Sequence, residues 1–154
     1  MDPQWLDSEE QAAWRRIVGL VTALPTALEG QLQRDSGLTH FEYWVLSALS
    51  EAPEHTLRMG CLADTAHGSL SRLSHVARRL ERRGMLTRRP DPADGRSTLA
   101  TLTDDGWDVV SAAAPGHVAA VRRLVFDALT PEQTQLLAEI GDRVRRSVEA
   151  ERSP

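Results

Sequence analysis

Residues 69–84 read Ser69-Leu70-Ser71-Arg72-Leu73-Ser74-His75-Val76-Ala77-Arg78-Arg79-Leu80-Glu81-Arg82-Arg83-Gly84. At 100° per residue one side of such a helix is apolar, made of Leu70, Leu73, Val76, Ala77 and Leu80. The opposite side carries Ser71, His75, Arg78 and Arg82. Ser69 is a good N-cap and Gly84 a good C-terminal residue, so the pattern predicts a helix over 70–83. About 14 residues give a rod of roughly 21 Å, which suits a DNA major groove.

The flanking sequence turns this helix into a larger motif. Upstream, Leu57–Ala66 predicts a helix that a short turn, 65–69, joins to it, which gives a helix-turn-helix. Downstream, 85–89 and 98–102 have strand character, and the proline- and aspartate-rich stretch 90–95 between them predicts a hairpin with a long tip. A hairpin directly behind a helix-turn-helix makes a winged helix-turn-helix.

Helices surround this centre. Ser8 and Gln11 form a capping-box pattern before a helix of about 25 residues, which we expect to bend at Pro25. A second capping box at Thr39 and Glu42 begins a shorter helix. Helices are also expected after 103, with a kink at 115–116, and from 130 to about 150. The predicted fold class is therefore mainly α with a small β-hairpin wing.

Composition bounds the function. The 154 residues fit a single domain, and a single cysteine excludes an internal disulfide. No apolar run approaches the roughly 20 residues of a membrane span, and the N-terminus lacks a signal-peptide pattern, so the expected location is cytoplasmic. No phosphate-binding loop, nucleophile elbow or metal-ligand spacing is present, which argues against an enzyme, a metal site or a cofactor.

The charge is unevenly distributed. The net charge is −4, which at first argues against a nucleic-acid partner. All 18 basic residues are arginine, and nine of them lie in 58–96 with only four acidic residues. This segment therefore carries +5 and the remainder −9. From charge alone, a solvated basic face and an electrostatic footprint for phosphate both remain open.

The wing adds a second contact point. Asp94, Gly95 and Arg96 lie at the predicted tip, where the aspartate is placed to hold the guanidinium at a fixed angle. An arginine on a projecting wing can enter a minor groove, whose potential is strongly negative. An ordinary turn with an exposed arginine is the alternative.

Taken together, the motifs resemble the MarR family of bacterial transcriptional regulators over about residues 10–148. The resemblance rests on the Leu-Glu-x-x-Gly set ending at Gly84, the Asp-x-Arg set at Arg96 and the Leu-Thr-x-x-Gly set ending at Gly106. The Ser-Arg-Leu-Ser-His run that ends at His75 and the stretch 114–118 are similar to the actinobacterial branch of this family.

The resemblance implies a homodimer that binds double-stranded DNA at a palindromic operator, most simply as a repressor. Within one MarR-like domain, 1–154, the DNA-binding lobe would span 37–107, and 8–33 with 108–150 would form the dimerisation helices. Uncovered apolar stripes on these helices agree with burial against a two-fold copy. The implied DNA-binding residues are Arg58, Ser69, Ser71, Arg72, Ser74, His75, Arg78, Asp94 and Arg96. His75 departs from the arginine common at its position, which puts a direct guanine contact there in doubt.

Regulation is also expected from the resemblance, because family members often bind small aromatic effectors. Candidate effector-binding residues are Trp14, His40, Trp44 and His117, which combine aromatic faces with polar tips. They are otherwise core or interface residues. Two alternatives stay open: redox sensing through Cys61, which a buried and inert thiol would exclude, and a winged helix that binds only protein.

Overall fold

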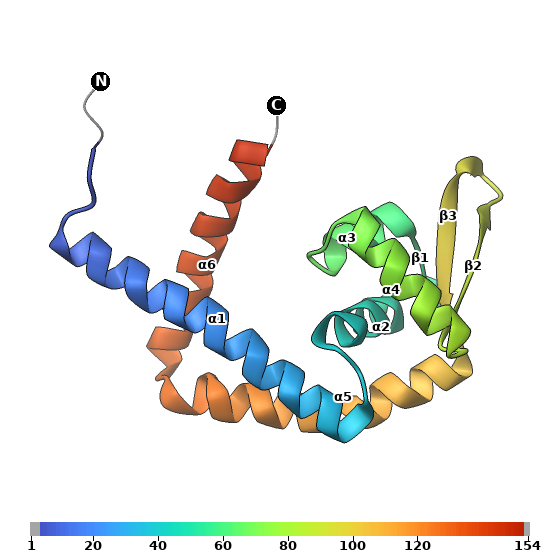
Figure 1. Cartoon of the computed structure of the whole chain (residues 1–154), viewed down its shortest axis with the longest axis horizontal. Helices are drawn as coiled ribbons and strands as arrows, with labels where there is room; N and C mark the ends of the chain where they lie inside the picture. The colour runs from blue at the N-terminus through green and yellow to red at the C-terminus, as the bar shows by residue number, and fades with distance from the viewer. Residues whose placement is uncertain (1–3, 153–154) are drawn as a thin grey trace. The chain divides into compact units, whose positions relative to one another are not determined.

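The computed structural model describes residues 4–152 of the chain, so the ends of the predicted single domain, 1–3 and 153–154, lie outside the described residues (Figure 1). The helices are α1 (Ser8–Ser36), α2 (His40–Glu51), α3 (Met59–Thr65), α4 (Leu70–Arg82), α5 (Asp104–Leu124) and α6 (Pro131–Arg152). The strands are β1 (Thr56–Arg58), β2 (Leu86–Asp91) and β3 (Asp94–Leu102), and two 3-10 turns lie at Pro53–His55 and Phe126–Ala128. The mainly α fold with a small wing is therefore confirmed.

The chain forms two compact units, which divide between His117 and Val118. The first unit holds the small sheet. Its order is β1-β3-β2 and both pairings are antiparallel, with Arg58 opposite Leu99 and Leu86 opposite Leu102. Helices α2, α3 and α4 supply most of the core beside this sheet, together with the C-terminal end of α1. Its largest fully buried apolar side chains are Leu32, Leu38, Val45, Leu46, Leu49, Leu62, Leu73, Leu80 and Leu86.

The start of α5 is fixed to the turn between α4 and β2. Thr103 Oγ1 donates to the carbonyl of Gly84 at 2.6 Å and accepts from the Gly106 N–H at 3.1 Å. A Cβ at position 106 would collide with the carbonyl oxygen of Met85 and lie 2.8 Å from Leu102 Cδ1. The Leu-Thr-x-x-Gly motif is thus a packing motif that needs glycine at its last position.

Three local predictions were wrong. The stretch predicted as a helix over 57–66 begins as strand β1, because Thr56–Arg58 pairs with β3, and becomes helical only at Met59. The long hairpin tip is short, since β2 and β3 extend to Asp91 and Asp94. Asp7, with Glu10 at N3, caps α1 in place of Ser8.

Both internal prolines lie within continuous helices, so the interruption expected at 115–116 needs correction, whereas the bend expected at Pro25 stays a prediction. Helix α1 is a single element that contains Pro25, and α5 continues through Pro115 to Leu124. Pro115 lies in the described continuous helix, so the expected interruption at 115–116 is not found.

The second unit contains the end of α5, a 3-10 turn and α6. Thr130 caps α6 as predicted: its Oγ1 accepts from the Gln133 N–H at 3.2 Å, and its own N–H donates to Gln133 Oε1 at 2.9 Å. An apolar stripe along α6 is exposed; it comprises Leu136, Leu137, Ile140, Val144 and Val148.

One helical stretch is long and apolar enough for a membrane span, although none was predicted. By length and composition alone, Asp104–Ala128 is long and apolar enough to cross a bilayer, with a mean hydropathy of 1.2 over its most apolar window. The prediction that no segment reaches this level is wrong on that criterion. Helices that bury an apolar face against other protein satisfy the same criterion, so this observation does not by itself indicate a membrane.

Candidate nucleic-acid interface

Helix α4 presents its polar side to solvent. Leu73, Ala77 and Leu80 are fully buried and attach the helix to the core. The opposite side chains, Ser71, His75, Arg78 and Arg82, are all exposed. The predicted division of the helix into an anchoring stripe and a cationic stripe is confirmed, except that Leu70, expected on the anchoring stripe, is exposed.

Two of the predicted serine contacts are engaged within α4. Ser69 caps the helix, with its Oγ accepting from the Arg72 N–H at 3.2 Å. Ser74 Oγ donates to the carbonyl of Leu70 at 2.8 Å. Each hydroxyl keeps hydrogen-bonding capacity, since a hydroxyl both donates and accepts. Ser69 therefore retains its donor, and Ser74 retains its acceptor positions.

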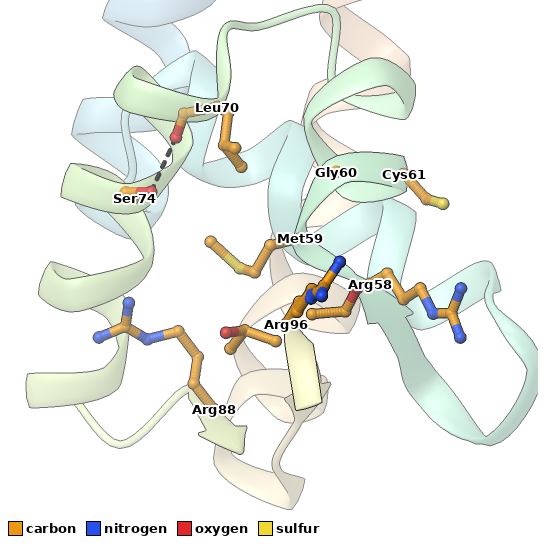
Figure 2. A pocket seen from close by; sticks show the side chains of 10 residues that line it. Arg58, Met59, Gly60, Cys61, Leu70, Ser74, Arg88 and Arg96 are labelled. Atoms are coloured by element: carbon orange, nitrogen blue, oxygen red, sulfur yellow. Dashed lines mark hydrogen bonds between the residues drawn. The ribbon is translucent and has the colours of Figure 1, made fainter. Parts of the chain in front are cut away.

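A cavity of about 420 Å³ lies between the start of α3, helix α4 and the wing (Figure 2). Three arginines reach it from three strands: Arg58 from β1, Arg88 from β2 and Arg96 from β3. The other lining residues are Met59, Gly60, Cys61, Leu70, Ser74, Ser97 and Thr98. None of these described lining residues is acidic, although Arg58 and Arg88 are paired with carboxylates outside the lining, so Arg96 is the lining arginine without a described ion pair.

The wing tip differs from the prediction in one respect. Asp94 Oδ1 accepts from the backbone N–H of Arg96 at 3.1 Å, and its Oδ2 accepts from Ser97 Oγ at 2.8 Å. Asp94 therefore shapes the turn and does not hold the Arg96 guanidinium. The prediction that it orients that side chain is wrong, and the exposed Arg96 has no ion pair among residues 4–152.

A different aspartate of the wing orients an arginine. Arg58 Nε donates to Asp91 Oδ2 at 2.7 Å, and Asp91 Oδ1 accepts from the Ala93 N–H at 2.9 Å. The Ala93 N–H, with the Arg58 guanidinium, lowers the pKa of Asp91, so this carboxyl is an anion at neutral pH. The bond to Nε leaves the terminal nitrogens of the half-exposed Arg58 available.

The arginines of segment 58–96 fall into two groups. Four are ion-paired within the protein: Arg58 with Asp91, Arg79 and Arg83 with Glu42, and Arg88 with Glu81. The Arg88 bonds lower the pKa of Glu81. Five have no ion pair within the described part of the chain: Arg72, Arg78, Arg82, Arg89 and Arg96. The free positive charge is therefore smaller than the sequence count suggests and lies on α4 and the wing.

Arg72 occupies an intermediate position. Its Cζ lies 4.1 Å from the centroid of the Phe41 ring, a cation–π arrangement. It also lines a second cavity, of about 320 Å³, with Pro25, Glu29, His40, Phe41, Trp44, Ala66 and His67. The stacking uses the face of the guanidinium, so its N–H donors are not consumed by the ring.

Three of the four predicted effector residues lie together. Trp44 Nε1 donates to His40 Nε2 at 2.9 Å, and the rings of His40 and His117 are 5.7 Å apart. Burial lowers the pKa of both His40 and His117, so both imidazoles are biased towards the neutral form. Of the four, only His40 and Trp44 line the second cavity; His117 is buried beside His40, and Trp14 is exposed on α1.

Sequence reasoning missed the residues that act through tertiary contacts. Arg88 lines the basic cavity because β2 folds back beside α4, where its side chain meets Glu81. Glu42 was predicted only as the capping residue of α2, yet it also reaches α4. No local sequence signal indicates the contact of Glu42 with Arg79, 37 positions away, or of Arg58 with Asp91, 33 positions away.

Cys61 is exposed and lines the basic cavity, so the buried thiol that would exclude redox sensing is not found. Among residues 4–152, no group of three or more His, Cys, Asp or Glu side chains is placed to hold a metal ion.

Comparison with known proteins places this geometry in a family. The MarR family model matches residues 36–97, which include α2, α3, α4 and most of the wing. The DNA complex of Sco3205, a MarR family transcriptional regulator from Streptomyces coelicolor, has a TM-score of 0.91 and 46% identity. That similarity covers 95% of this chain and 91% of the other.

Two further proteins similar to this chain are also transcriptional regulators. AbsC, a MarR family transcriptional regulator from Streptomyces coelicolor, is 35% identical with a TM-score of 0.91, covering 96% of this chain and 99% of the other. The HTH-type transcriptional regulator YkoM of Bacillus subtilis is 33% identical over 68% of this chain and 66% of its own length. The chain therefore belongs to the MarR family of DNA-binding transcriptional regulators.

Proposed function

We propose that the protein is a cytoplasmic, non-enzymatic repressor that binds a palindromic operator as a homodimer. The observation that carries this proposal is the set of exposed arginines without described ion pairs on the outward side of α4 and on the wing. Arg78 and Arg82 are exposed there without ion pairs among the described residues, and Arg96 projects from the wing. Relatives that regulate transcription, one of them in complex with DNA, support the same reading.

The DNA contacts divide by position on this surface. The first turns of α4, with Ser69, Ser71, Arg72, Ser74, His75 and Arg78, would enter the major groove, where side chains reach base edges. Arg96 would approach the adjacent minor groove on the wing whose turn Asp94 shapes. Arg58, held by Asp91, would contact the phosphate backbone.

A second copy of the chain is the proposed cover for the apolar helices. On α1, Trp14 is 57% exposed and Val21 is 62% exposed, and Val144 on α6 is 55% exposed. Such stripes on a soluble helix are stable only when they are buried against other protein. A two-fold dimer would cover them and set two α4 helices about 34 Å apart, one turn of DNA. The dimerisation helices would be 8–33 and 108–150, outside the DNA-binding lobe at 37–107.

Selection of genomic fragments with the purified protein tests this proposal. We expect enrichment of an inverted repeat whose binding weakens steeply with salt. Light scattering should give the mass of a dimer. The position of the repeat over a promoter, with reduced transcript in a reconstituted assay, would support repression. Failure to select any duplex at low salt would contradict the proposal.

One variant separates base readout from backbone contact on α4. Replacing Arg72 with alanine should cost about 1–3 kcal/mol more on the operator than on random duplex if Arg72 contacts a base. Equal losses on the two duplexes would assign Arg72 to phosphate.

A small aromatic acid is the proposed effector, bound in the cavity beside His40 and Trp44. The exposed Trp44 ring offers a stacking surface, and the Arg72 guanidinium offers a partner for a carboxylate. The regulator BpsR of Bordetella bronchiseptica, whose DNA binding 6-hydroxynicotinic acid regulates, shares the fold at 22% identity and suggests a probe. Calorimetry with this acid and with benzoate should show binding that a Trp44→Ala variant loses. If neither acid binds, the proposal of a small aromatic acid as the effector is contradicted.

Oxidation of the Cys61 thiol to a sulfenic acid by a peroxide, which is itself reduced to water or an alcohol, is a second candidate for regulation, favoured by the exposure of Cys61 at the basic cavity. Alkylation with iodoacetate would add a negative charge beside Arg58 and Arg96 and should weaken operator binding. A Cys61→Ser variant should bind DNA normally and resist this loss. Unchanged binding after complete alkylation would contradict the proposal.

A further inference from the structure

The arginines of α4 and its C-terminal turn are divided between two sides. Arg79 and Arg83 lie four positions apart, on the side of the helix that faces α2, and both are ion-paired there. Arg78 and Arg82 lie on the outward side, exposed and without ion pairs among residues 4–152. Neighbouring arginines on α4 therefore differ in one respect: Arg79 and Arg83 are ion-paired, whereas Arg78 and Arg82 are not among the described residues.

A single buried carboxylate holds the inner pair. Glu42 of α2 is 1% exposed. Its Oε1 accepts from Arg79 Nε at 2.7 Å and from Arg83 Nη1 at 3.4 Å. Its Oε2 accepts from the Thr39 N–H at 2.8 Å, which completes the capping box of α2. A buried carboxylate is tolerated only with such partners, so Glu42 links the start of α2 firmly to α4.

This link restrains the rotation of α4 about its own axis. The apolar contacts of Leu73, Ala77 and Leu80 press the helix onto the core but are not directional. The hydrogen bonds to Glu42 are directional, and a rotation of the helix would break them. They therefore help to determine that His75, Arg78 and Arg82 point outward.

The same link affects how strongly the surface attracts any DNA. Each arginine that reaches a phosphate adds affinity that is independent of sequence and falls with salt. Arg79 and Arg83 are partly exposed and adjacent in sequence to the outward arginines. If their bonds to Glu42 were lost, both guanidinium groups would be available to bind DNA phosphates. Holding them at Glu42 fixes both guanidinium groups on the side of α4 that faces α2, away from the outward side that is proposed to approach the phosphates.

We propose that Glu42 is a positioning residue that determines operator specificity, by fixing the orientation of α4 and withholding Arg79 and Arg83 from phosphate. This rests on the proposed function of α4 as the DNA-reading helix. Glu42 itself does not touch DNA. Its removal should therefore change the ratio between specific and nonspecific binding more than it changes binding overall.

The test compares Glu42→Gln with Glu51→Gln in the full chain. Glu51 is exposed on the same helix and has no ion pair within the described residues, so it controls for the loss of one negative charge. Affinities for the selected operator and for a scrambled duplex of equal length are measured over a salt series. For Glu42→Gln we expect scrambled-duplex affinity to rise about threefold or more, and its salt slope to steepen by about 0.9 for each arginine released. The discrimination between the duplexes should fall about tenfold.

Removal of the released arginines checks the cause. The triple variant Glu42→Gln, Arg79→Gln, Arg83→Gln should lose the added scrambled-duplex affinity and the added slope. If Glu42→Gln behaves as Glu51→Gln does, or if it weakens both duplexes equally while lowering the melting temperature, the proposal is overturned.

A pair of neighbouring variants tests the proposal without disturbing Glu42. Arg82→Gln should reduce the salt slope by about 0.9 per chain, whereas Arg83→Gln, which leaves Arg79 on Glu42, should not change it. Equal reductions by both variants would show that Arg83 already contacts phosphate and would overturn the proposal. If Arg78→Ala and Arg82→Gln both leave binding unchanged, α4 is not the reading helix, and the proposed function has failed instead.

Discussion

Arg58 on β1 and Asp91 at the end of β2 are joined by a 2.7 Å hydrogen bond between Nε and Oδ2, across 33 positions of sequence. The bond ties Arg58, the residue before α3, to the wing, and Arg58 lines the basic cavity. Because Asp91 also accepts from the Ala93 N–H, one carboxylate fixes an arginine and the turn of the hairpin together.

Replacement of Asp91 by asparagine should lower the melting temperature at neutral pH, because the ionic bond to Arg58 is lost. The pKa of Asp91 is lowered in the fold, so its stabilising effect is present above the unfolded value of about 4 and is lost as the pH falls through the lower folded value. The difference from wild type should therefore vanish in strong acid. Asp94→Asn, at the exposed tip, is the control; an equal change in both variants would refute a special role for Asp91.

Arg96→Ala should weaken binding to operator and scrambled duplex by similar factors. An exposed wing arginine contributes mainly through groove potential and phosphate, so the salt slope should fall by about one for each arginine removed. Fluorescence anisotropy over a salt series measures both effects. A loss confined to the operator would instead assign Arg96 to base readout.

Gly106→Ala should destabilise the protein by about 1–3 kcal/mol, the usual range for overpacking. The added Cβ would collide with the Met85 carbonyl oxygen and displace the start of α5 from the turn after α4. Gly60 has no atom within 4 Å of an added Cβ and is the matched control for urea unfolding. Equal stability of the two alanine variants would contradict the packing described at Gly106.

Acid should destabilise the fold through His40 and His117. Burial lowers the pKa of each, so the unfolded chain binds protons first as the pH falls below about 6.5, and stability decreases from there until the folded value is passed. A His117→Gln variant should lose less melting temperature between neutral and mildly acid pH than wild type does. His75→Gln, on the exposed side of α4, should retain the full loss; a wild-type melting temperature independent of pH would contradict this account.

The elements predicted best were those specified by local signals. Ser69 before an amphipathic run and Thr130 with Gln133 carry their capping information within four residues, and both helices begin where predicted. Strand β1 was missed because Thr56–Arg58 is extended only through its pairing with β3, some 40 positions later. Pro115 does not interrupt α5, which runs from Asp104 to Leu124, so a proline alone did not mark a helix end here.

In the candidate site, too, only the features that depend on local sequence were predictable. The outward face of α4 was predictable from helical periodicity, whereas the pairing of each arginine was not. Glu42 and Asp91 select which guanidinium groups remain free, and both act over more than thirty positions of sequence. The net charge of segment 58–96 therefore overstates the charge available to DNA.

The central claim is that the outward face of α4 and the wing together bind duplex DNA with sequence preference. The most direct measurement is the salt dependence of affinity for the selected operator and its scrambled form, for wild type and Arg78→Ala. The account predicts a linear fall of log affinity with log salt, at least a thousandfold preference for the operator at moderate salt, and a marked loss of that preference in the variant. Equal affinity for both duplexes, or a variant that discriminates as wild type does, would contradict it.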